Sequence, residues 1–369
     1  MFDPQTLLQA THTMPRSILS AYDLNEDQCI IEAFGTGLIN HTWKVSHGSR
    51  DFILQRINNS VFPDPLAIAE NMVVIQDFLR IHSPDYLFVN SIATKTGAPM
   101  HFEPGKGYFR LLPFIADSFT YDVVKSPMIA YEAAKQFGTF TKKLADLDIS
   151  LLKTTLPDFH NLTLRYQQFE SALETATTAR MKLASFSIKT IIAQKGIVST
   201  FEAIRQNPDF KLRVTHHDTK ISNVLFNAEG KGLCVIDLDT TMPGYFISDA
   251  GDMMRTYLSP VSEEERNLSA INIREAYFVA VAEGYLNQMK TELSEIELEH
   301  FVYSGEFMIY MQALRFLTDY LENDRYYGSK YPDHNLVRTQ NQLELLDCFQ
   351  QKKTALAQHV EALLHMGAS

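Results

Sequence analysis

Cysteine is scarce in this 369-residue sequence, which has three, Cys29, Cys234 and Cys348, far apart along the chain. No two of them form a C-x-x-C pair, and this argues against both a disulfide framework and a structural zinc site. Long apolar runs are missing as well, since no uninterrupted stretch approaches the length of a membrane span. The N-terminus lacks a basic segment followed by an apolar run, so it shows no signal peptide. We therefore expect a cytoplasmic protein.

Positive charge is also in short supply, with 33 Lys and Arg against 44 Asp and Glu and a formal net charge of -11. Phosphate backbones and anionic membrane surfaces bind clustered cations, so we expect no nucleic-acid partner and no membrane partner. A small anionic ligand remains compatible with this charge if a few cations or a metal gather at one site. The rest of the composition, 45% hydrophobic and 21% charged residues, is that of a folded globular protein. A chain of this length favours two domains or lobes over one.

Strand-like segments are concentrated in the first third of the chain. Five runs rich in β-branched or aromatic residues, bounded by turn-forming residues, predict strands over 29–34, 41–46, 51–57, 86–93 and 107–115. One helix is predicted among them over 62–82, with Pro65 suited to the first helical position. A short apolar-periodic stretch before the strands predicts one or two lead-in helices within residues 1–28.

The rest of the chain has the three- and four-residue apolar spacing of helices over 127–147, 160–205, 261–295, 300–324 and 335–366. One segment interrupts it, 214–240, where two short apolar runs are joined by the turn-like NAEGKG and predict a hairpin. We expect an α+β protein of two lobes. A small antiparallel-sheet lobe with one helix takes 29–113, and a larger, mostly helical lobe takes 114–369.

The predicted hairpin carries residues suited to phosphoryl transfer. Asp218 is followed five residues later by Asn223, at the entry to the first strand, and Asp237 ends the second strand. Because a hairpin folds back on itself, Asn223 and Asp237 should come out at the same end, near Asp218. Carboxylate and amide oxygens suit Mg²⁺, and a carboxylate left off the metal can orient a hydroxyl and accept its proton. The alternative is that Asp218 and Asn223 only cap turns.

Three stretches of the sequence, HHDTKISNVLF, VIDLDTTMPG and LPDFHNLTLRY, resemble a known group. The sequence is similar to the aminoglycoside phosphotransferase and choline kinase superfamily, relatives of the protein kinases. Within it, the sequence most resembles the N-acetylhexosamine 1-kinases. The resemblance covers nearly the whole chain, from GTGLINHTWKV to ALRFLTDYLENDRYY. It implies a bilobal protein-kinase-like fold, ATP as phosphoryl donor and Mg²⁺ as cofactor.

The resemblance assigns roles in the hairpin residue by residue. Asp218 matches the aspartate that orients and deprotonates the acceptor hydroxyl, and Asn223 and Asp237 match the metal-binding residues. Lys220 lies where many protein kinases place a lysine near the transferring phosphate. A plain surface lysine is the alternative for this position.

The first lobe would bind the nucleotide. GTGLIN takes the nucleotide-loop position, where Gly35 and Gly37 let backbone N–H groups approach the phosphates, and Asn40 stands where a third glycine would fall. Arg56 on the third strand replaces the lysine of the kinase pattern as the phosphate cation. Alternation along the strand leaves an ambiguity of one residue, since Gln55 would point to the opposite face.

Further residues are expected to support these groups. Glu70 on the following helix is the expected ion-pair partner of the strand cation, unless it is a solvated surface charge. Backbone groups around Leu112 and Phe114, at the hinge between the lobes, would meet the adenine. Asp249 and Asp252 match a stretch after the metal motif and are expected to support the loop of the base.

Acceptor recognition is expected from the larger lobe. Asp239 lies two residues beyond the metal aspartate and projects to the same side if the strand persists, where it would accept hydrogen bonds from sugar hydroxyls. Arg315 lies in an otherwise apolar run and is costly to bury without a partner, so it is either a sugar or carboxylate contact or part of a structural ion pair. Tyr326 and Tyr327 follow and offer flat, amphipathic surfaces suited to sugars.

The leading hypothesis is an ATP-dependent, Mg²⁺-dependent kinase that phosphorylates the anomeric hydroxyl of N-acetylglucosamine or N-acetylgalactosamine, without an obligatory protein partner. A second hypothesis changes the acceptor to choline, ethanolamine, homoserine or an aminoglycoside. Cationic acceptors would favour a pocket rich in acids and aromatic faces. A third is a non-catalytic pseudokinase scaffold, which predicts damage to the base or metal positions, yet Asp218, Asn223 and Asp237 are all present.

Overall fold

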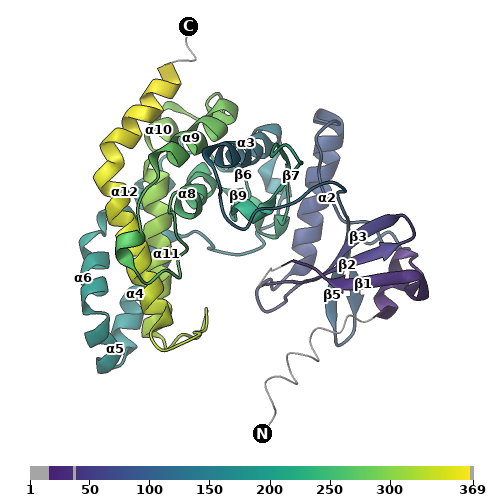
Figure 1. The fold of residues 1–369 in the computed structure, drawn as a ribbon, viewed down its shortest axis with the longest axis horizontal. Coiled ribbons are helices and arrows are strands. Elements are labelled where there is room, and N and C mark those ends of the chain that lie inside the picture. Colours follow the sequence, from purple (N-terminus) through teal and green to yellow (C-terminus); the bar gives the residue numbers. More distant parts are fainter. Residues whose placement is uncertain (1–15, 36–38, 366–369) are drawn as a thin grey trace. The chain divides into compact units, whose positions relative to one another are not determined.

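The computed structural model describes residues 16–35 and 39–365, which divide into two compact units (Figure 1). The first unit comprises the described residues up to Ser118 together with Asp146–Leu156 and Ile236–Met242. The second comprises Phe119–Ala145, Pro157–Val235 and the described residues from Pro243 onward.

A five-stranded antiparallel sheet with strand order β1-β2-β3-β5-β4 is the main feature of the first unit. Its strands are β1 Cys29–Ala33, β2 His41–His47, β3 Arg50–Arg56, β4 His101–Glu103 and β5 Gly107–Pro113. Side chains alternate between the two faces of a strand, so one face can be apolar throughout. Trp43, Leu54 and Leu111 lie in register across β2, β3 and β5 on that face. They pack with Ile18 and Leu19 of the 3₁₀ helix η1 (Arg16–Tyr22) to form the core of the unit.

Helix α2 (Pro65–His82) belongs to the same unit and begins where the sequence predicts. Asp64 is its N-cap, and the Asp64 carboxylate accepts hydrogen bonds from the backbone N–H groups of Leu66 and Ala67 at 3.1 and 3.3 Å. Pro65 follows at the first helical position, where a missing N–H group costs nothing. Cap and proline together fix the start of this helix locally.

The predicted strand over 86–93 is wrong. Within this segment only Ile92 forms a bridge, to Leu111 of β5, and β4 is the edge strand instead. The Asn90 side chain accepts a hydrogen bond from the backbone N–H of Ser91 at 2.7 Å. Such a local bond competes with a regular strand ladder.

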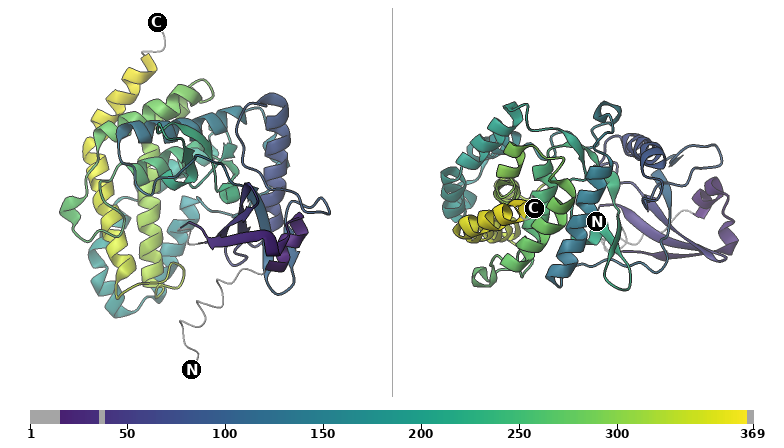
Figure 2. Two further views of the ribbon diagram at one scale, coloured as in Figure 1. Left: turned by 45° about the vertical axis from the view of Figure 1, so that its right-hand side comes forward. Right: turned by 90° about the horizontal axis from the view of Figure 1, so that it is seen from above.

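Helices make up most of the second unit. Their bounds are α3 Pro127–Lys143, α4 Leu162–Thr175, α5 Thr178–Leu183, α6 Ser185–Ala193, α7 Gly196–Gln206, α8 Phe246–Tyr257, α9 Glu275–Met289, α10 Glu295–Glu299, α11 Tyr303–Leu321 and α12 His334–His365. Helix α11 is buried along most of its length and packs against α4, α8 and α12. Figure 1 and both views of Figure 2 show α11 and α12 side by side.

The sequence predicts correctly that this unit is helical, but it does not predict where the individual helices begin and end. The run over 160–205 is divided into α4, α5, α6 and α7, and within 261–295 the α-helices are α9 and the short α10, which starts at Glu295. The predicted hairpin is present as β7 (Val224–Phe226) paired antiparallel with β8 (Gly232–Val235). Two further short strands that the sequence did not indicate, β6 (Arg213–Thr215) and β9 (Met242–Gly244), form a second small sheet. The α+β class is confirmed.

Close contact between α8 and α11 depends on a glycine. A Cβ atom added to Gly251 would lie 2.2 Å from the carbonyl oxygen of Ser304, a backbone atom that cannot move aside cheaply. We expect Gly251→Ala to lower the free energy of unfolding by about 1–3 kcal/mol through overpacking, measured by urea denaturation followed by circular dichroism.

Gly196 in α7 is the matched control, because no atom lies within 4 Å of its added Cβ. Gly196→Ala should leave stability unchanged or raise it by about 0.5–1 kcal/mol, since alanine loses less backbone entropy in a helix. Equal losses in both variants would contradict the packing explanation.

Candidate active site

The backbone of residues 216–219, which we call the base loop, is held by two carboxylates of α8. Asp249 accepts hydrogen bonds from the backbone N–H groups of His216 and His217 at 3.0 and 2.7 Å. Asp252 accepts one from the N–H group of Thr219 at 2.9 Å. The predicted supporting role of Asp249 and Asp252 is confirmed.

Burial and hydrogen bonding shift the pKa of Asp249 in opposite directions. Burial raises the pKa of its carboxyl to about 6, although His216 and the backbone hydrogen bonds of His216 and His217 act in the opposite direction. Tyr257 at the end of α8 adds a further contact, since its hydroxyl donates to the carbonyl oxygen of Thr219 at 2.6 Å. The base loop is therefore held through both N–H and carbonyl groups.

A strained backbone conformation lies next to the candidate base. His217 has a φ of 67°, in the left-handed region that non-glycine residues seldom adopt. Gly244 makes room for its ring, because a Cβ atom on Gly244 would lie 2.4 Å from Cε1 of His217. The hydrogen bonds that Asp249 of α8 accepts from His216 and His217 hold the backbone in this strained conformation.

Asp218 follows His217 and projects a carboxylate that remains 21% exposed. The ammonium group of Lys220 lies 3.1 Å from one of its oxygens, and the Asp218 charge raises the pKa of Lys220 above its ordinary value. Lys220 is itself half exposed. Asn223 donates its side-chain N–H to the carbonyl oxygen of Asp218 at 2.9 Å, which fixes the amide and leaves its oxygen as an acceptor.

The hairpin register determines where the second acidic residue leaves the sheet. Val224 pairs with Val235, so Asn223 immediately precedes β7 and Asp237 comes two residues after the end of β8. The prediction that Asp237 ends the strand is therefore wrong by two residues. Asp237 has a φ of 60° and a ψ of 58°, and this left-handed turn takes the chain out of the ladder.

The strand does not persist to Asp239 either, which lies in the 3₁₀ turn η5 (Leu238–Thr240) of the first unit. Its side chain is 2% exposed and pairs with Arg110 at 2.5 Å. Its other oxygen accepts a hydrogen bond from the Asn40 amide at 2.7 Å. The carboxylate predicted for the sugar and the amide predicted for the nucleotide loop are thus bonded to each other.

Arg110 is the buried cation that the sequence interpretation missed. It lies on β5 opposite Gln55, is 1% exposed, and donates two hydrogen bonds to the Gln55 amide oxygen at 2.9 and 2.8 Å. The available signal was an arginine inside the apolar strand YFRLLPFI, which needs a partner when buried.

The predicted pair between Arg56 and Glu70 is not formed. Glu70 pairs with Lys153, which is brought near because its backbone N–H donates to the Asn71 side chain at 2.7 Å. Side chains alternate along β3, so Arg56 lies on the same sheet face as Leu54. Leu54 is part of the core of this unit.

Lys44 lies on the opposite sheet face from Arg56, in register with Ile53 of β3 and Leu112 of β5. Its ammonium group is 4.5 Å from the centre of the Phe114 ring and 2.8 Å from the Asp51 carboxylate. Phe34 meets the same ring edge-on at 6.0 Å, and the next residue, Gly35, has a φ of 76°. The structure thus brings the start of the predicted nucleotide loop near Phe114.

Two further residues, Gly37 and Leu112, are predicted to bind the nucleotide. Gly37 lies outside the described residues. Leu112 is partly buried on β5, where it pairs with Ile53 of β3. Both assignments remain predictions.

Arg315 of α11 lies among three aromatic rings. The centres of the Phe159, Tyr326 and Tyr327 rings are 5.5, 5.7 and 5.6 Å from its guanidinium carbon, and we call these four residues the aromatic box. Among residues 16–35 and 39–365, Arg315 forms no ion pair with a carboxylate. The alternative of a structural ion pair for Arg315 is therefore not supported.

Two histidines lie beside the box. The Nδ1 atoms of His160 and His217 are 3.3 Å apart, and Phe159 stacks on the His160 ring at 4.4 Å. Burial, followed by the nearby charges of His217 and Arg315, keeps the pKa of His160 well below its ordinary value. A neutral His160 at this place adds a hydrogen-bonding group without adding charge.

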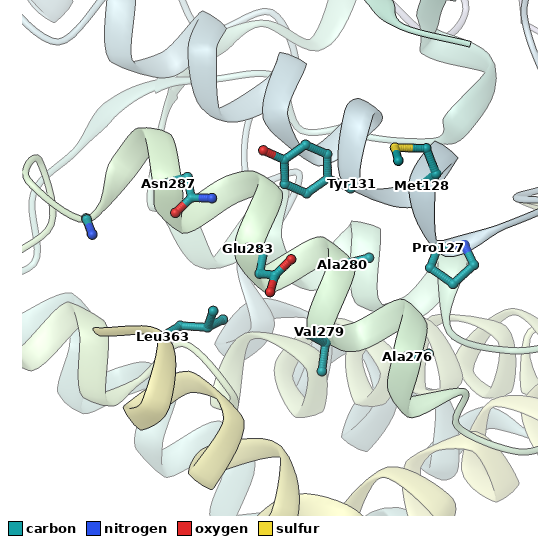
Figure 3. A pocket seen from close by; sticks show the side chains of 10 residues that line it. Pro127, Met128, Tyr131, Ala276, Val279, Ala280, Glu283, Asn287 and Leu363 are labelled. Carbon is teal, nitrogen blue, oxygen red and sulfur yellow. The ribbon is translucent and has the colours of Figure 1, made fainter. Parts of the chain in front are cut away.

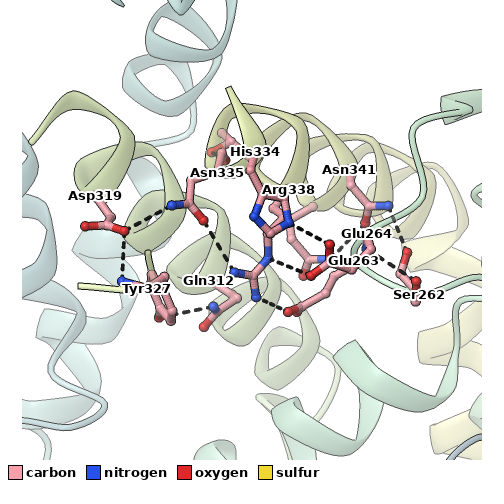
Figure 4. A network of polar contacts seen from close by, with 12 residues as sticks. Ser262, Glu263, Glu264, Gln312, Asp319, Tyr327, His334, Asn335, Arg338 and Asn341 are labelled. Atoms are coloured by element: carbon pink, nitrogen blue, oxygen red, sulfur yellow. Dashed lines mark hydrogen bonds and ion pairs between the residues drawn. The ribbon is translucent and has the colours of Figure 1, made fainter. Parts of the chain in front are cut away.

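The loop that carries the two tyrosines is fixed by Asp319 of α11. Asp319 accepts hydrogen bonds from the backbone N–H groups of Tyr326 and Tyr327 at 2.7 and 2.9 Å. Asn335 of α12 donates to the same carboxylate at 3.1 Å, as Figure 4 shows in part. The Tyr326 ring stays 70% exposed and so remains accessible to a ligand.

A separate groove of about 640 Å³ lies between α3, α9 and the end of α12 (Figure 3). Met128, Val279 and Leu363 contribute apolar surface, and Glu283 and Lys290 contribute charge. None of the residues lining it is a predicted site residue. Across the described part of the chain, no cluster of three His, Cys, Asp or Glu side chains could hold a metal, and no helix has the length and apolarity to cross a membrane.

Comparison with known proteins identifies the family. Residues 30–287 match the model of the phosphotransferase enzyme family, APH. This match spans more than half of the sequence, and the chain belongs to that family.

Solved structures agree on the kinase-like fold. An aminoglycoside phosphotransferase from Alicyclobacillus acidocaldarius has a TM-score of 0.61 at 13% identity, over 95% of this chain and 97% of that one. The microcompartment-associated aminopropanol kinase gives 0.59 at 12% identity, over 93% and 97%. Choline kinase from Cryptosporidium parvum gives 0.54 at 14% identity, over 97% and 98%. At these identities the structures show the fold alone; the predicted superfamily is confirmed by the family match over residues 30–287.

Removing Arg110 should strongly destabilise the first unit. Arg110→Met leaves the Asp239 carboxylate buried without its cation, so we expect a loss of about 3–5 kcal/mol in the free energy of unfolding, measured by urea denaturation. Lys95→Met is the control, because it removes an exposed pair with Asp23 and should cost less than about 1 kcal/mol. Similar losses in the two variants would contradict the importance of the buried pair.

The raised pKa of Asp249 predicts a pH dependence of stability. Between the ordinary pKa of 3.8 and about 6, the unfolded state is ionised while the folded state keeps its proton. Stability contributed by protonated Asp249 is therefore fully present below pH 3.8 and is lost as the pH rises through 6.

The comparison to make is with Asp249→Asn, which cannot ionise. The unfolding free energy of the native protein, relative to this variant, should fall by up to about 3 kcal/mol between pH 4 and pH 6.5, measured by urea denaturation at each pH. A difference that grows with pH would show that the folded protein stabilises the carboxylate instead.

Proposed function

We propose that this phosphotransferase is an ATP-dependent kinase that phosphorylates the anomeric hydroxyl of N-acetylhexosamines. The observation that supports this acceptor is Arg315, a guanidinium with no carboxylate partner in the described part of the chain, enclosed by aromatic rings. Guanidinium N–H groups donate to hydroxyl and N-acetyl oxygens, and aromatic faces pack against sugar rings. The aromatic box suits a neutral, oxygen-rich acceptor.

Cationic acceptors fit the same box poorly. An ammonium group is bound by free aromatic faces or by carboxylates, and here a protein cation already occupies the space between the rings. Choline, ethanolamine and aminoglycosides would place a second positive charge near Arg315. Homoserine, which carries a carboxylate, is the alternative acceptor that this argument disfavours least.

In the proposed reaction Asp218 orients the acceptor hydroxyl and accepts its proton. The base loop contributes by keeping this carboxylate in one place, since Asp249 and Asp252 hold the backbone on either side of it. Lys220, 3.1 Å from Asp218, would place a positive charge beside the phosphoryl group as it transfers.

We propose Asn223 and Asp237 as the protein ligands of Mg²⁺. Their amide and carboxylate oxygens are the ligands this ion prefers, and it commonly completes its shell with waters and phosphate oxygens, so two protein ligands suffice. The hydrogen bond from the Asn223 amide to Asp218 leaves its oxygen as the free ligand atom. When bound, the metal would neutralise charge on the phosphates.

The nucleotide is proposed to bind the first unit. Gly35 and Gly37 would present N–H groups to the phosphates, and backbone groups at Leu112 and Phe114 would bind the adenine. Arg56 is the phosphate cation expected from the sequence, and Lys44 is a second candidate because it lies on the sheet face of Phe114. Asn40, Glu70 and Asp239 would then act through the bonds they already form rather than by direct contact.

An acceptor panel tests the proposal. With Mg²⁺ and ATP, we expect ADP release to depend on N-acetylglucosamine or N-acetylgalactosamine, and not on choline, ethanolamine or an aminoglycoside. Turnover of choline without turnover of either sugar would reject the proposed acceptor while keeping the kinase chemistry. ATP binding without turnover of any acceptor would favour the pseudokinase hypothesis.

The base is tested by Asp218→Asn, which keeps the size of the side chain and removes its ability to accept a proton. We expect kcat to fall by about 10²–10⁴-fold with ATP affinity nearly unchanged, measured by ADP release and by nucleotide titration. Asp209→Asn is the matched control, because Asp209 is an exposed residue of the same unit with no predicted role. Unchanged turnover in Asp218→Asn would remove Asp218 from the mechanism.

A further inference from the structure

An unbroken series of largely shielded charges leads away from the base loop. Asp252 accepts the N–H of Thr219 with one oxygen and hydrogen bonds from Arg255 at 3.0 and 3.2 Å with the other. Arg255 also donates to Glu263 at 3.0 Å, and Glu263 in turn pairs with Arg338 of α12. Negative and positive charges thus alternate from α8 to α12, and we call these four residues the charge series.

The far end of the charge series contacts the aromatic box. The guanidinium carbon of Arg338 lies 3.7 Å from the centre of the Phe316 ring and 5.3 Å from that of Tyr327. Phe316 meets the Tyr327 ring edge-on at 4.9 Å, and Gln312 donates to the Tyr327 hydroxyl at 3.2 Å. Figure 4 shows Arg338 between Glu263 and this group.

The charges in the series are interdependent. Arg255 is 11% exposed, Arg338 13% and Asp252 7%, so little water is available to replace a lost partner at these three, whereas Glu263 between the two arginines is 28% exposed. Burial would raise the pKa of Glu263, but Arg255 and Arg338 outweigh it and the pKa lies below its ordinary value. Glu263 is therefore ionised at neutral pH between two guanidinium groups, and removing either one affects the other.

The segment that carries Glu263 is itself fixed by α12. The Asn341 side chain donates to the carbonyl oxygens of Ser262 and Glu265 at 3.1 and 3.0 Å, on either side of Glu263. Glu263 therefore has a defined position rather than that of a mobile surface side chain.

We propose that Glu263 and Arg338 are positioning residues that hold the aromatic box in register with the base loop. Neither side chain would touch the substrate. Arg338 would act through Tyr327, whose ring lies against Arg315, and Glu263 would act in both directions, through Arg338 and through Arg255. This inference rests on the proposed function in one respect, that the aromatic box binds the acceptor.

The proposal predicts that substitutions along the charge series change KM and kcat to different extents, depending on their position. A residue near the box should affect acceptor binding, whereas one near the base loop should affect the chemical step. Arg338→Met should raise the acceptor KM by about tenfold and leave kcat and the KM for ATP within about twofold. Glu263→Gln should raise the acceptor KM and also lower kcat, because it loosens Arg255 and Asp252 as well.

Lys352→Met is the matched control for Arg338→Met. Lys352 lies on the same helix and forms an ion pair with Glu275 at 2.7 Å, but neither residue contacts the box. It should change no kinetic constant by more than about twofold. Arg338→Lys separates charge from shape: it keeps a cation beside Glu263 but not the planar stack on Phe316, so acceptor KM should rise about threefold.

The measurements are initial rates at one temperature, well below the unfolding of every variant, with the concentrations of N-acetylglucosamine and ATP varied separately. An acceptor KM that is unchanged in Arg338→Met, or that rises together with the KM for ATP, would overturn the proposal. So would equal effects in Lys352→Met. If Arg338→Met does not fold, Arg338→Lys decides the question by the same comparison.

A second readout does not depend on the identity of the acceptor. Hydrogen exchange of the Tyr326 and Tyr327 amides, which donate to Asp319, should be about tenfold faster in Arg338→Met and unchanged in Lys352→Met. If the protein turns over another alcohol of the panel, the proposed sugar is wrong, and the kinetic comparison is made with that alcohol. Unchanged exchange would reject the positioning role even if the sugar is correct.

Discussion

Two carboxylates on one helix fix the backbone of the loop that carries the proposed base, Asp218. Asp249 and Asp252 of α8 accept the backbone N–H groups of His216, His217 and Thr219, and so fix the loop from which Asp218 projects. The left-handed conformation of His217 has an energetic cost, and these hydrogen bonds offset it. A helix position without a Cβ, Gly251, lets α8 approach α11, which carries Arg315. The helix that holds the base loop and the helix that carries Arg315 are therefore in direct contact.

The sequence predicted those elements of the fold that are determined by residues close together in the chain. The start of α2 follows from an N-cap and a proline, and the hairpin of β7 and β8 follows from two apolar runs around a turn. The run over 160–205 kept its periodicity through several helix ends, because side-chain caps such as Thr177 start new helices without changing the apolar spacing. Periodicity therefore indicated helix correctly and helix boundaries poorly.

The partners of several predicted site residues come from contacts between residues far apart in the sequence. Asp239 and Asn40 were each assigned to a ligand, but their side chains bond to each other, and Asp239 also pairs with Arg110. Glu70 is paired with Lys153 rather than with Arg56 for the same reason. No local pattern specifies such partners. By contrast, short motifs bring Asp218 and Asn223 together and place the two supporting aspartates of α8, as the hydrogen bonds among these residues show.

The account of the acceptor depends on Arg315, a cation that has no acidic partner within the described ranges 16–35 and 39–365. Belonging to the phosphotransferase family leaves the acceptor open, since the similar solved structures include kinases named for aminopropanol and choline. In the function we propose, the aromatic box selects the acceptor and the base loop supplies the base. The most direct measurement is ³¹P and ¹H NMR of the product formed from N-acetylglucosamine with Mg²⁺ and ATP. We predict a phosphorus signal coupled to the anomeric proton; phosphate at another position, or no sugar phosphate at all, would contradict the account.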